Sequence, residues 1–325
     1  MMFPVNHGVL AAGAGSSATP ATSYMAVTGE GTNGLTVYST ANWSIVANPA
    51  LQDCSPVAFS PDGTQLAVGY SGGLVILDTS TWSVISGTPE MNGLVLQDLA
   101  WSPSGRYLAV IYHSESPYLA VFDTTDWSAV SGTPILPGTG RGVAFSPDGS
   151  LLVATFASSP SWKIFSTSDW TEVATLPAVS TGGFKPGFSS DGAYLAMAHS
   201  GSPGSLVVGT GDWSEISTPY LSTTGYAAVF APDSSLLALA CYNNGVITVL
   251  ETADWVGVTE VPNYSGYGRD TDFSPDGGMM AVVGYDSSSV GFIKVIQTED
   301  WTEISDAPTP PGRVFGVSFG TPPSV

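Results

Sequence analysis

Residues 57–85 read VAFSPDGTQLAVGYSGGLVILDTSTWSVI. The tetrapeptide at 60–63, Ser-Pro-Asp-Gly, predicts a tight hairpin, because proline presets the first turn torsion and glycine accepts positive φ. Short apolar runs rich in β-branched residues stand on either side of it, and a third run at 74–78 alternates with period two. A second turn then leads to Trp82, which we expect to open a fourth strand. The stretch therefore predicts four short antiparallel strands and no helix.

The sequence contains seven copies of this stretch, and two sets of residues mark them. An aromatic residue ends the first strand of each copy, at intervals of 42–46 residues: Phe59, Trp101, Phe145, Phe188, Phe230, Phe273 and Phe319. Seven of the nine tryptophans repeat in step with them: Trp43, Trp82, Trp127, Trp170, Trp213, Trp255 and Trp301. A threonine stands three residues before each of these tryptophans. A repeat of this length with four strands is typical of a propeller blade, so we predict an all-β, seven-bladed β-propeller of four-stranded antiparallel blades.

The first copy lacks its first strand. It begins with a second-strand pattern at 24–28, and the missing pattern stands at the far end of the chain, at 314–319. The C-terminal strand should therefore pair into the first blade and close the ring, which removes the open sheet edge. We predict one domain over residues 23–325, with residues 1–22 outside it as an N-terminal arm.

The composition limits the possible partners and chemistry. Seven basic residues stand against 27 acidic ones, for a net charge of −20, which argues against nucleic acid as a partner because phosphate binding needs cations. No apolar run is long enough to insert into a membrane. The three histidines stand apart, and neither a Gly-x-Ser-x-Gly elbow nor a metal-ligand cluster is present. We therefore predict no enzymatic activity, no cofactor and no metal.

The two faces of the predicted disc differ in character. The face that carries both hairpin turns, called here the turn face, should be acidic through ten aspartates: Asp62, Asp126, Asp148, Asp169, Asp191, Asp212, Asp233, Asp254, Asp276 and Asp300. Aspartate is a turn residue, since its side chain bonds to backbone amides. The alternative is a ring that docks a basic partner or collects cations.

The opposite face, called here the loop face, should hold the binding residues. Four of the seven basic residues fall just before a first strand, and aromatic residues gather there too. Asp272 stands out, because the other copies have Ala, Gly, Val or Ser at its position. A carboxylate near the channel needs a partner, so either an ion pair with Arg269 or a ligand or ion site is expected. The aromatic residues fit packing between blades, or a binding surface for sugars or a protein. The candidate binding residues are Asp98, Arg141, Lys185, His199, Tyr226, Tyr267, Arg269, Asp270 and Asp272.

The FSPDG turns at 59–63, 145–149 and 273–277, each followed by a strand of Leu-Ala-Val type, resemble those of bacterial WD40-like and YVTN/lactonase-type propellers. The resemblance covers about residues 23–319 and implies the fold. The chain departs from the WD40 pattern, because its order is Asp-Trp, as in Asp126-Trp127, and no Gly-His opening is present. No residue set matches the channel-mouth residues of the lactonase type. The acidic, lysine-poor, Ser/Thr/Gly-rich character is similar to that of tailed-phage virion proteins.

These observations favour a non-catalytic interaction platform, an accessory or tail component of a phage virion. The arm or the turn face would dock on other virion proteins, and the loop face would meet a host surface protein or glycan. The alternative is a secreted or periplasmic protein, either a lactonase-type propeller enzyme or a glycan- or protein-binding module. An open electronegative channel lined by Asp270, Asp272 and His199 would favour the enzyme.

Overall fold

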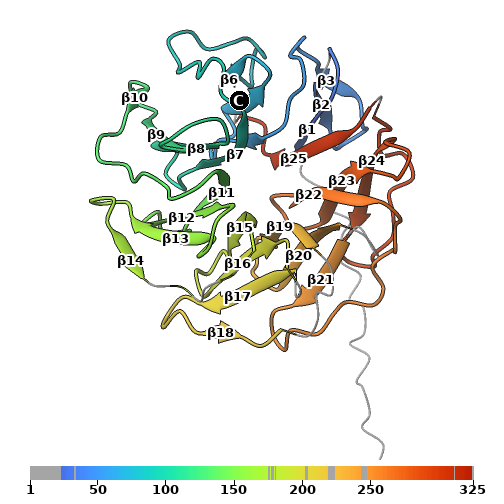
Figure 1. The fold of residues 1–325 in the computed structure, drawn as a ribbon. Helices are drawn as coiled ribbons and strands as arrows, with labels where there is room; N and C mark the ends of the chain where they lie inside the picture. Colours follow the sequence, from blue (N-terminus) through green and yellow to red (C-terminus); the bar gives the residue numbers. More distant parts are fainter. Residues whose placement is uncertain are drawn as a thin grey trace, which may run out of the picture.

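The computed structural model describes residues 23–32, 34–174, 176, 179, 181–201, 204–218, 224–242, 247–310 and 312–323. Among these residues there are strands and no helices, which confirms the predicted all-β class. The strands gather into successive antiparallel sheets around a common centre (Figure 1). The predicted arm at 1–22 lies outside the described residues.

The first copy and the end of the chain form one four-stranded sheet in the order β25-β1-β2-β3. Its strands are β1 (Tyr24–Gly29), β2 (Leu35–Ser39), β3 (Ile45–Ala47) and β25 (Val314–Gly320). β25 runs antiparallel to β1, from Tyr24 opposite Gly320 to Gly29 opposite Val314. The C-terminal strand therefore completes the sheet of the first copy, as predicted.

The second, third and fourth copies form separate sheets. The second has β4 (Val57–Phe59), β5 (Gln65–Tyr70) and β6 (Gly73–Asp78). The third has β7 (Leu96–Trp101), β8 (Tyr107–Tyr112), β9 (Leu119–Asp123) and β10 (Ser128–Ala129). The fourth has β11 (Gly140–Phe145), β12 (Leu151–Phe156), β13 (Trp162–Ser166) and β14 (Glu172–Ala174). In the second copy the fourth strand is reduced to a bridge between Leu77 and Val84.

The last three copies join into one ten-stranded sheet. The fifth has β15 (Gly183–Phe188), β16 (Tyr194–His199), β17 (Ser205–Gly209) and β18 (Glu215–Ile216). The sixth has β19 (Thr224–Phe230), β20 (Leu236–Tyr242) and β21 (Ile247–Glu251); the seventh has β22 (Tyr267–Phe273), β23 (Met279–Tyr285) and β24 (Gly291–Gln297). Single pairs, Lys185 with Ala227 and Tyr242 with Tyr267, link the copies. The outer strands of the sixth and seventh copies are again reduced to single bridges. The prediction of four strands per copy therefore holds for four copies, the first, third, fourth and fifth.

The first strand of each copy lies innermost. These inner strands contact one another in a cycle, in which each strand touches the next and the last touches the first: β4, β7, β11, β15, β19, β22 and β25. Their backbones approach closely, since a Cβ on Gly142 would stand 2.7 Å from the Cα of Lys185. A Cβ on Gly187 would stand 2.4 Å from the carbonyl oxygen of Ala228. Larger side chains at these two glycines would push neighbouring inner strands apart.

The hydrophobic core lies between neighbouring sheets. One cluster joins Ala26 and Leu35 of the first copy to Phe59 and Leu66 of the second. Another joins the third and fourth copies through residues that include Ile111 and Phe156. Each sheet thus buries its apolar face against the next one, and every core cluster of the described residues joins two copies.

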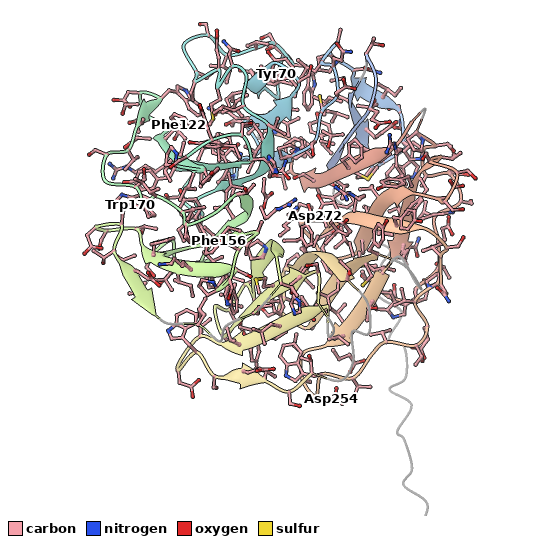
Figure 2. All side chains as sticks on the ribbon, viewed as in Figure 1. Tyr70, Phe122, Phe156, Trp170, Asp254 and Asp272 are labelled. Atoms are coloured by element: carbon pink, nitrogen blue, oxygen red, sulfur yellow. The ribbon has the colours of Figure 1, made fainter. Side chains whose placement is uncertain are left out.

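All seven repeat tryptophans have left-handed backbone torsions, with φ between 57° and 61°. The amide of Trp170 donates to the carbonyl of Ser166 at 2.9 Å, so the tryptophan closes the turn instead of opening the fourth strand. A bulky residue is uncommon at such a position. Its ring packs on the preceding copy, as Trp170 does on Tyr107 and Trp255 on Tyr194, with centroids 6.2 and 5.0 Å apart. This packing offsets the unfavourable torsion. Figure 2 shows that Trp170 lies toward the rim of the molecule.

The repeated threonine joins the two turns of its copy. In the fourth copy the hydroxyl of Thr167 donates to the carbonyl of Gly149 in the first hairpin at 2.7 Å. Its amide donates to the carbonyl of Ser150 at 2.9 Å. The same hydroxyl bond occurs in the second, third, fifth, sixth and seventh copies. A hydroxyl donor at this position therefore links the two turns in six of the seven copies, and in the first copy the hydroxyl of Thr40 donates to the carbonyl of Ser23 at 3.0 Å.

We expect Thr167→Val to lower the free energy of unfolding by about 1 kcal/mol, because the Gly149 carbonyl loses its hydroxyl donor while the side-chain shape is kept. Thr167→Ser keeps the donor and should lose less. Urea unfolding followed by tryptophan fluorescence measures both variants. Equal losses in the two would contradict the role of the hydroxyl.

Candidate binding site

The inner strands share an irregularity that shapes the centre of the molecule. Register shifts fall between Leu96 and Asp98 in β7, and between Gly268 and Asp270 in β22. Equivalent shifts occur in β11, β15, β19 and β25. Each bulge adds a residue four places before the anchor aromatic. A β-bulge changes the direction in which the side chains around it point.

These residues surround a cavity of about 330 Å³ at the centre. Every inner strand or the segment entering it contributes to the lining: Ser55, Pro56, Val57, Gln97, Asp98, Arg141, Phe184, Lys185, Tyr226, Arg269, Asp270 and Phe315. Six of the nine predicted site residues are among them. Reasoning from sequence missed Ser55 and Gln97, although both stand four residues before their anchor aromatics, as Arg141 and Arg269 do.

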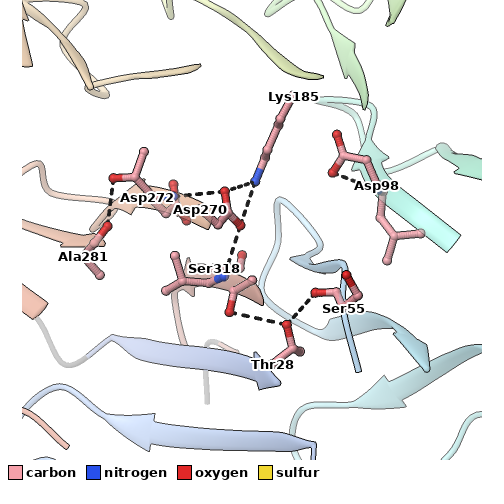
Figure 3. A network of polar contacts seen from close by, with 12 residues as sticks. Thr28, Ser55, Asp98, Lys185, Asp270, Asp272, Ala281 and Ser318 are labelled. Carbon is pink, nitrogen blue, oxygen red and sulfur yellow. Dashed lines mark hydrogen bonds and ion pairs between the residues drawn. The ribbon is translucent and has the colours of Figure 1, made fainter. Parts of the chain in front are cut away.

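An ion pair lies at the floor of the cavity. The ammonium of Lys185 lies 2.9 and 3.1 Å from the two carboxylate oxygens of Asp270 (Figure 3). Asp270 is buried, and Lys185 retains 28% side-chain exposure. Asp270 also accepts hydrogen bonds from the amides of Thr271 and Val317 at 3.0 and 3.1 Å. The pair thus joins β15 to β22 and, through Val317, to β25.

Two further aspartates join neighbouring inner strands in the same way. Asp98 of β7 accepts from the amide of Val143 in β11 at 3.0 Å. Asp272 of β22, which lies near the centre in Figure 2, accepts from the amide of Phe319 in β25 at 2.8 Å. Asp272 bonds to its own neighbour Phe273 as well, at 2.9 Å. The expected ion pair between Asp272 and Arg269 is therefore wrong, because backbone amides satisfy this carboxylate.

Burial and mutual charge change the acidity of these groups. Burial raises the pKa of Asp98 to about 6, against the opposing charge of Lys185. Burial raises the pKa of Asp272 to about 7, again opposed by Lys185. Burial lowers the pKa of Lys185, but the surrounding carboxylates, Asp270 foremost, outweigh it and hold this pKa above its ordinary value. Lys185 is therefore charged, and its charge limits the rise in the pKa values of Asp98 and Asp272.

Two arginines stand at the mouth of the cavity on aromatic rings. The guanidinium of Arg269 lies 4.3 Å from the ring centroid of Tyr226 and 5.8 Å from that of Phe315. The guanidinium of Arg141 lies 5.6 Å from the ring of Phe184. In the described part of the chain neither arginine has a carboxylate within ion-pair distance, whereas the other five basic residues do. Cation–π contacts orient these guanidiniums without neutralising them.

An aromatic row extends from the cavity over the fifth, sixth and seventh copies to β25 of the first copy. Its members, with neighbouring centroids 4.4–6.4 Å apart, are Phe184, Tyr226, Tyr242, Tyr267, Tyr285 and Phe315. Tyr267 stacks on Tyr242 at 4.4 Å and does not line the cavity. Arg313 lies over Tyr285 and pairs with Glu30 at 2.7 Å. Phe184, Tyr226 and Phe315 thus line the cavity, whereas Tyr242, Tyr267 and Tyr285 pack on one another outside it.

His199 lies apart from the cavity at the end of β16. It is buried, its Nδ1 accepts from the amide of Gly201 at 3.0 Å, and the hydroxyl of Thr181 lies 3.2 Å from it. Burial lowers its pKa. Neither His199 nor Asp272 lines the cavity.

The ten aspartates of the turn face share one contact. Each accepts a hydrogen bond from the amide two residues later, at 2.9–3.1 Å. This confirms that turn formation accounts for the residue type. Among the described residues, no group of three or more His, Cys, Asp or Glu side chains could hold a metal. No helix in that part of the chain could cross a membrane.

Comparisons with known proteins add no assignment. No protein-family model matches the chain, and no curated protein matches its sequence. The cavity and its lining residues are therefore the features that indicate a function.

Proposed function

We propose that the seven copies are the blades of a closed β-propeller, and that the protein is a non-catalytic interaction platform with its ligand site at the centre of the loop face. The contact cycle of seven inner strands supports the ring. One observation carries the function: a single cavity is lined from all seven of these strands. Central cavities of this kind are where small ligands are expected to bind.

The lining favours binding over catalysis. His199 is remote from Asp270, so the histidine and the carboxylates expected of a lactonase-type enzyme do not meet in the cavity. The carboxylate of Asp98 bonds to backbone amides, and that of Asp270 bonds to backbone amides and to Lys185, as groups that hold strands together do. The secreted or periplasmic enzyme thus remains the second candidate, and turnover of any member of a lactone panel would favour it.

We further propose a location in a phage particle, as an accessory or tail component. This part rests on composition, namely a net charge of −20 and seven basic residues in 325. Other virion proteins would be its partners, and the loop face would meet a host surface protein or glycan. Mass spectrometry of purified particles and of secreted fractions tests the location. Detection in the secreted fraction alone would overturn it.

A further inference from the structure

The cavity concentrates positive charge in an acidic protein. Three of the seven basic residues of the chain line it: Arg141, Lys185 and Arg269. Lys185 is neutralised by Asp270, while the two guanidiniums have no carboxylate partner in the described chain. Three cations against two lining carboxylates, Asp98 and Asp270, leave one excess positive charge (3 − 2 = +1). The cavity therefore suits a ligand with a single negative charge.

The remaining lining groups suit a hydroxylated ring. Each carboxylate oxygen of Asp98 accepts one hydrogen bond and can accept a second, and this side chain lines the cavity. Both oxygens of Asp270 already accept two hydrogen bonds each. Gln97 and Ser55 add further donors and acceptors. The rings of Phe184, Tyr226 and Phe315 provide apolar surface beside the arginines. The volume of about 330 Å³ lies at the lower end of the usual range for ligand sites, which fits one sugar ring.

We propose that this cavity binds a monoanionic sugar, whose carboxylate is held by Arg141 and Arg269 and whose hydroxyls bond to Asp98 and Gln97. Guanidiniums bind carboxylates through paired hydrogen bonds. A sugar phosphate fits less well, because its second negative charge would face the two aspartates. The proposal deepens the proposed function by giving the central site a ligand class.

Ligand-observed NMR titration of the full chain at pH 7.5 tests this inference with three groups of probes. The monoanionic probes are D-glucuronate, D-galacturonate and N-acetylneuraminate, and the others are glucose and glucose 6-phosphate. At least one monoanionic sugar should bind saturably, about tenfold or more tighter than glucose and tighter than glucose 6-phosphate. No saturable binding of any monoanionic sugar, or equal binding of the phosphate, would overturn the proposal.

Variants then localise the binding. Arg141→Gln should weaken the best probe about tenfold or more, and Arg269→Lys should do likewise because it keeps the charge but loses the forked donors. The matched control is Arg313→Gln, since Arg313 lies on the same face but pairs with Glu30 outside the cavity. This control should bind within about twofold of the parent. Equal loss in control and cavity variants would place binding elsewhere.

Failure here can be told apart from failure of the proposed function. Thermal unfolding of each variant verifies that the fold is intact. A protein found in particles that binds no acidic sugar contradicts only the ligand class. Sugar binding by a protein that is absent from particles contradicts only the proposed location.

Discussion

A chain that ends before Arg313 should fail to unfold cooperatively. Such a truncation removes β25, which pairs with β1 along six residues and contacts both β4 and β22. It exposes the core, because Val314, Val317 and Phe319 are buried between the first and last copies. The expected loss exceeds the total stability of an ordinary domain, which is about 5–15 kcal/mol.

The truncation also removes one amide donor each from the buried carboxylate of Asp270 and the half-buried carboxylate of Asp272. Asp270 loses the amide of Val317, and Asp272 loses that of Phe319. An unpaired buried carboxylate is costly, so the damage reaches the centre of the molecule.

Denaturant unfolding followed by circular dichroism measures this result. The matched control is a chain that ends at Thr321, which keeps the whole of β25. The control should unfold in one transition like the full chain. A single transition at an unchanged midpoint in the shorter chain would contradict ring closure by β25.

The second large effect is expected from Lys185→Met, which should lower the free energy of unfolding by about 3 kcal/mol at pH 8. The variant leaves Asp270 buried without its cation, while Asp98 and Asp272 lose the charge that favours their ionised forms. Methionine keeps much of the apolar stem of lysine, so packing changes little. Urea unfolding measures the difference.

This loss should shrink as the pH falls. The folded-state pKa values of Asp98 and Asp272, about 6 and about 7, lie above the ordinary value near 4. Such raised groups contribute stability that is complete below their unfolded pKa and is lost as the pH rises through the folded pKa. Without Lys185 the pKa values of both aspartates rise further. Lowering the pH from 8 to 5 therefore stabilises the variant more than it stabilises the parent protein.

Lys163→Met is the matched control. Lys163 pairs with the exposed Glu172 away from the cavity, and exposed pairs contribute about 0–1 kcal/mol. This variant should lose less than 1 kcal/mol at either pH. Equal losses in the two variants would contradict the stabilising role of the Lys185–Asp270 pair. A loss of stability in Lys185→Met that does not change with pH would contradict it as well.

Much of the strand pattern could be predicted from the sequence. Turn formation at 60–63 and the alternating strands follow from local torsions and from side-chain periodicity, which act within a few residues. The position of Trp170 was harder to predict, because its left-handed torsion is compensated by contact with Tyr107 of the preceding copy. Local propensity contains no information about that contact.

The candidate site was predicted in part. Six of the nine residues line one cavity, because the basic and acidic residues before the anchor aromatics all reach the centre. His199 and Tyr267 lie elsewhere, and Arg269 was paired with the wrong partner. Partners such as Val143 for Asp98, 45 residues away, depend on how neighbouring inner strands approach each other.

The sequence by itself determined the all-β class, the seven copies, and the pairing of the last strand with the first. These features follow from repeated local signals and from one displaced copy of a strand. Only the tertiary structure decided which charges are neutralised. The bulges bring Arg141, Lys185 and Arg269 from three inner strands to one cavity. There Lys185 of β15 pairs with Asp270 of β22, two inner strands further on, while the arginines lie on aromatic rings. The physical reason is that charge pairing depends on distances across the centre, which spacing along the chain does not specify.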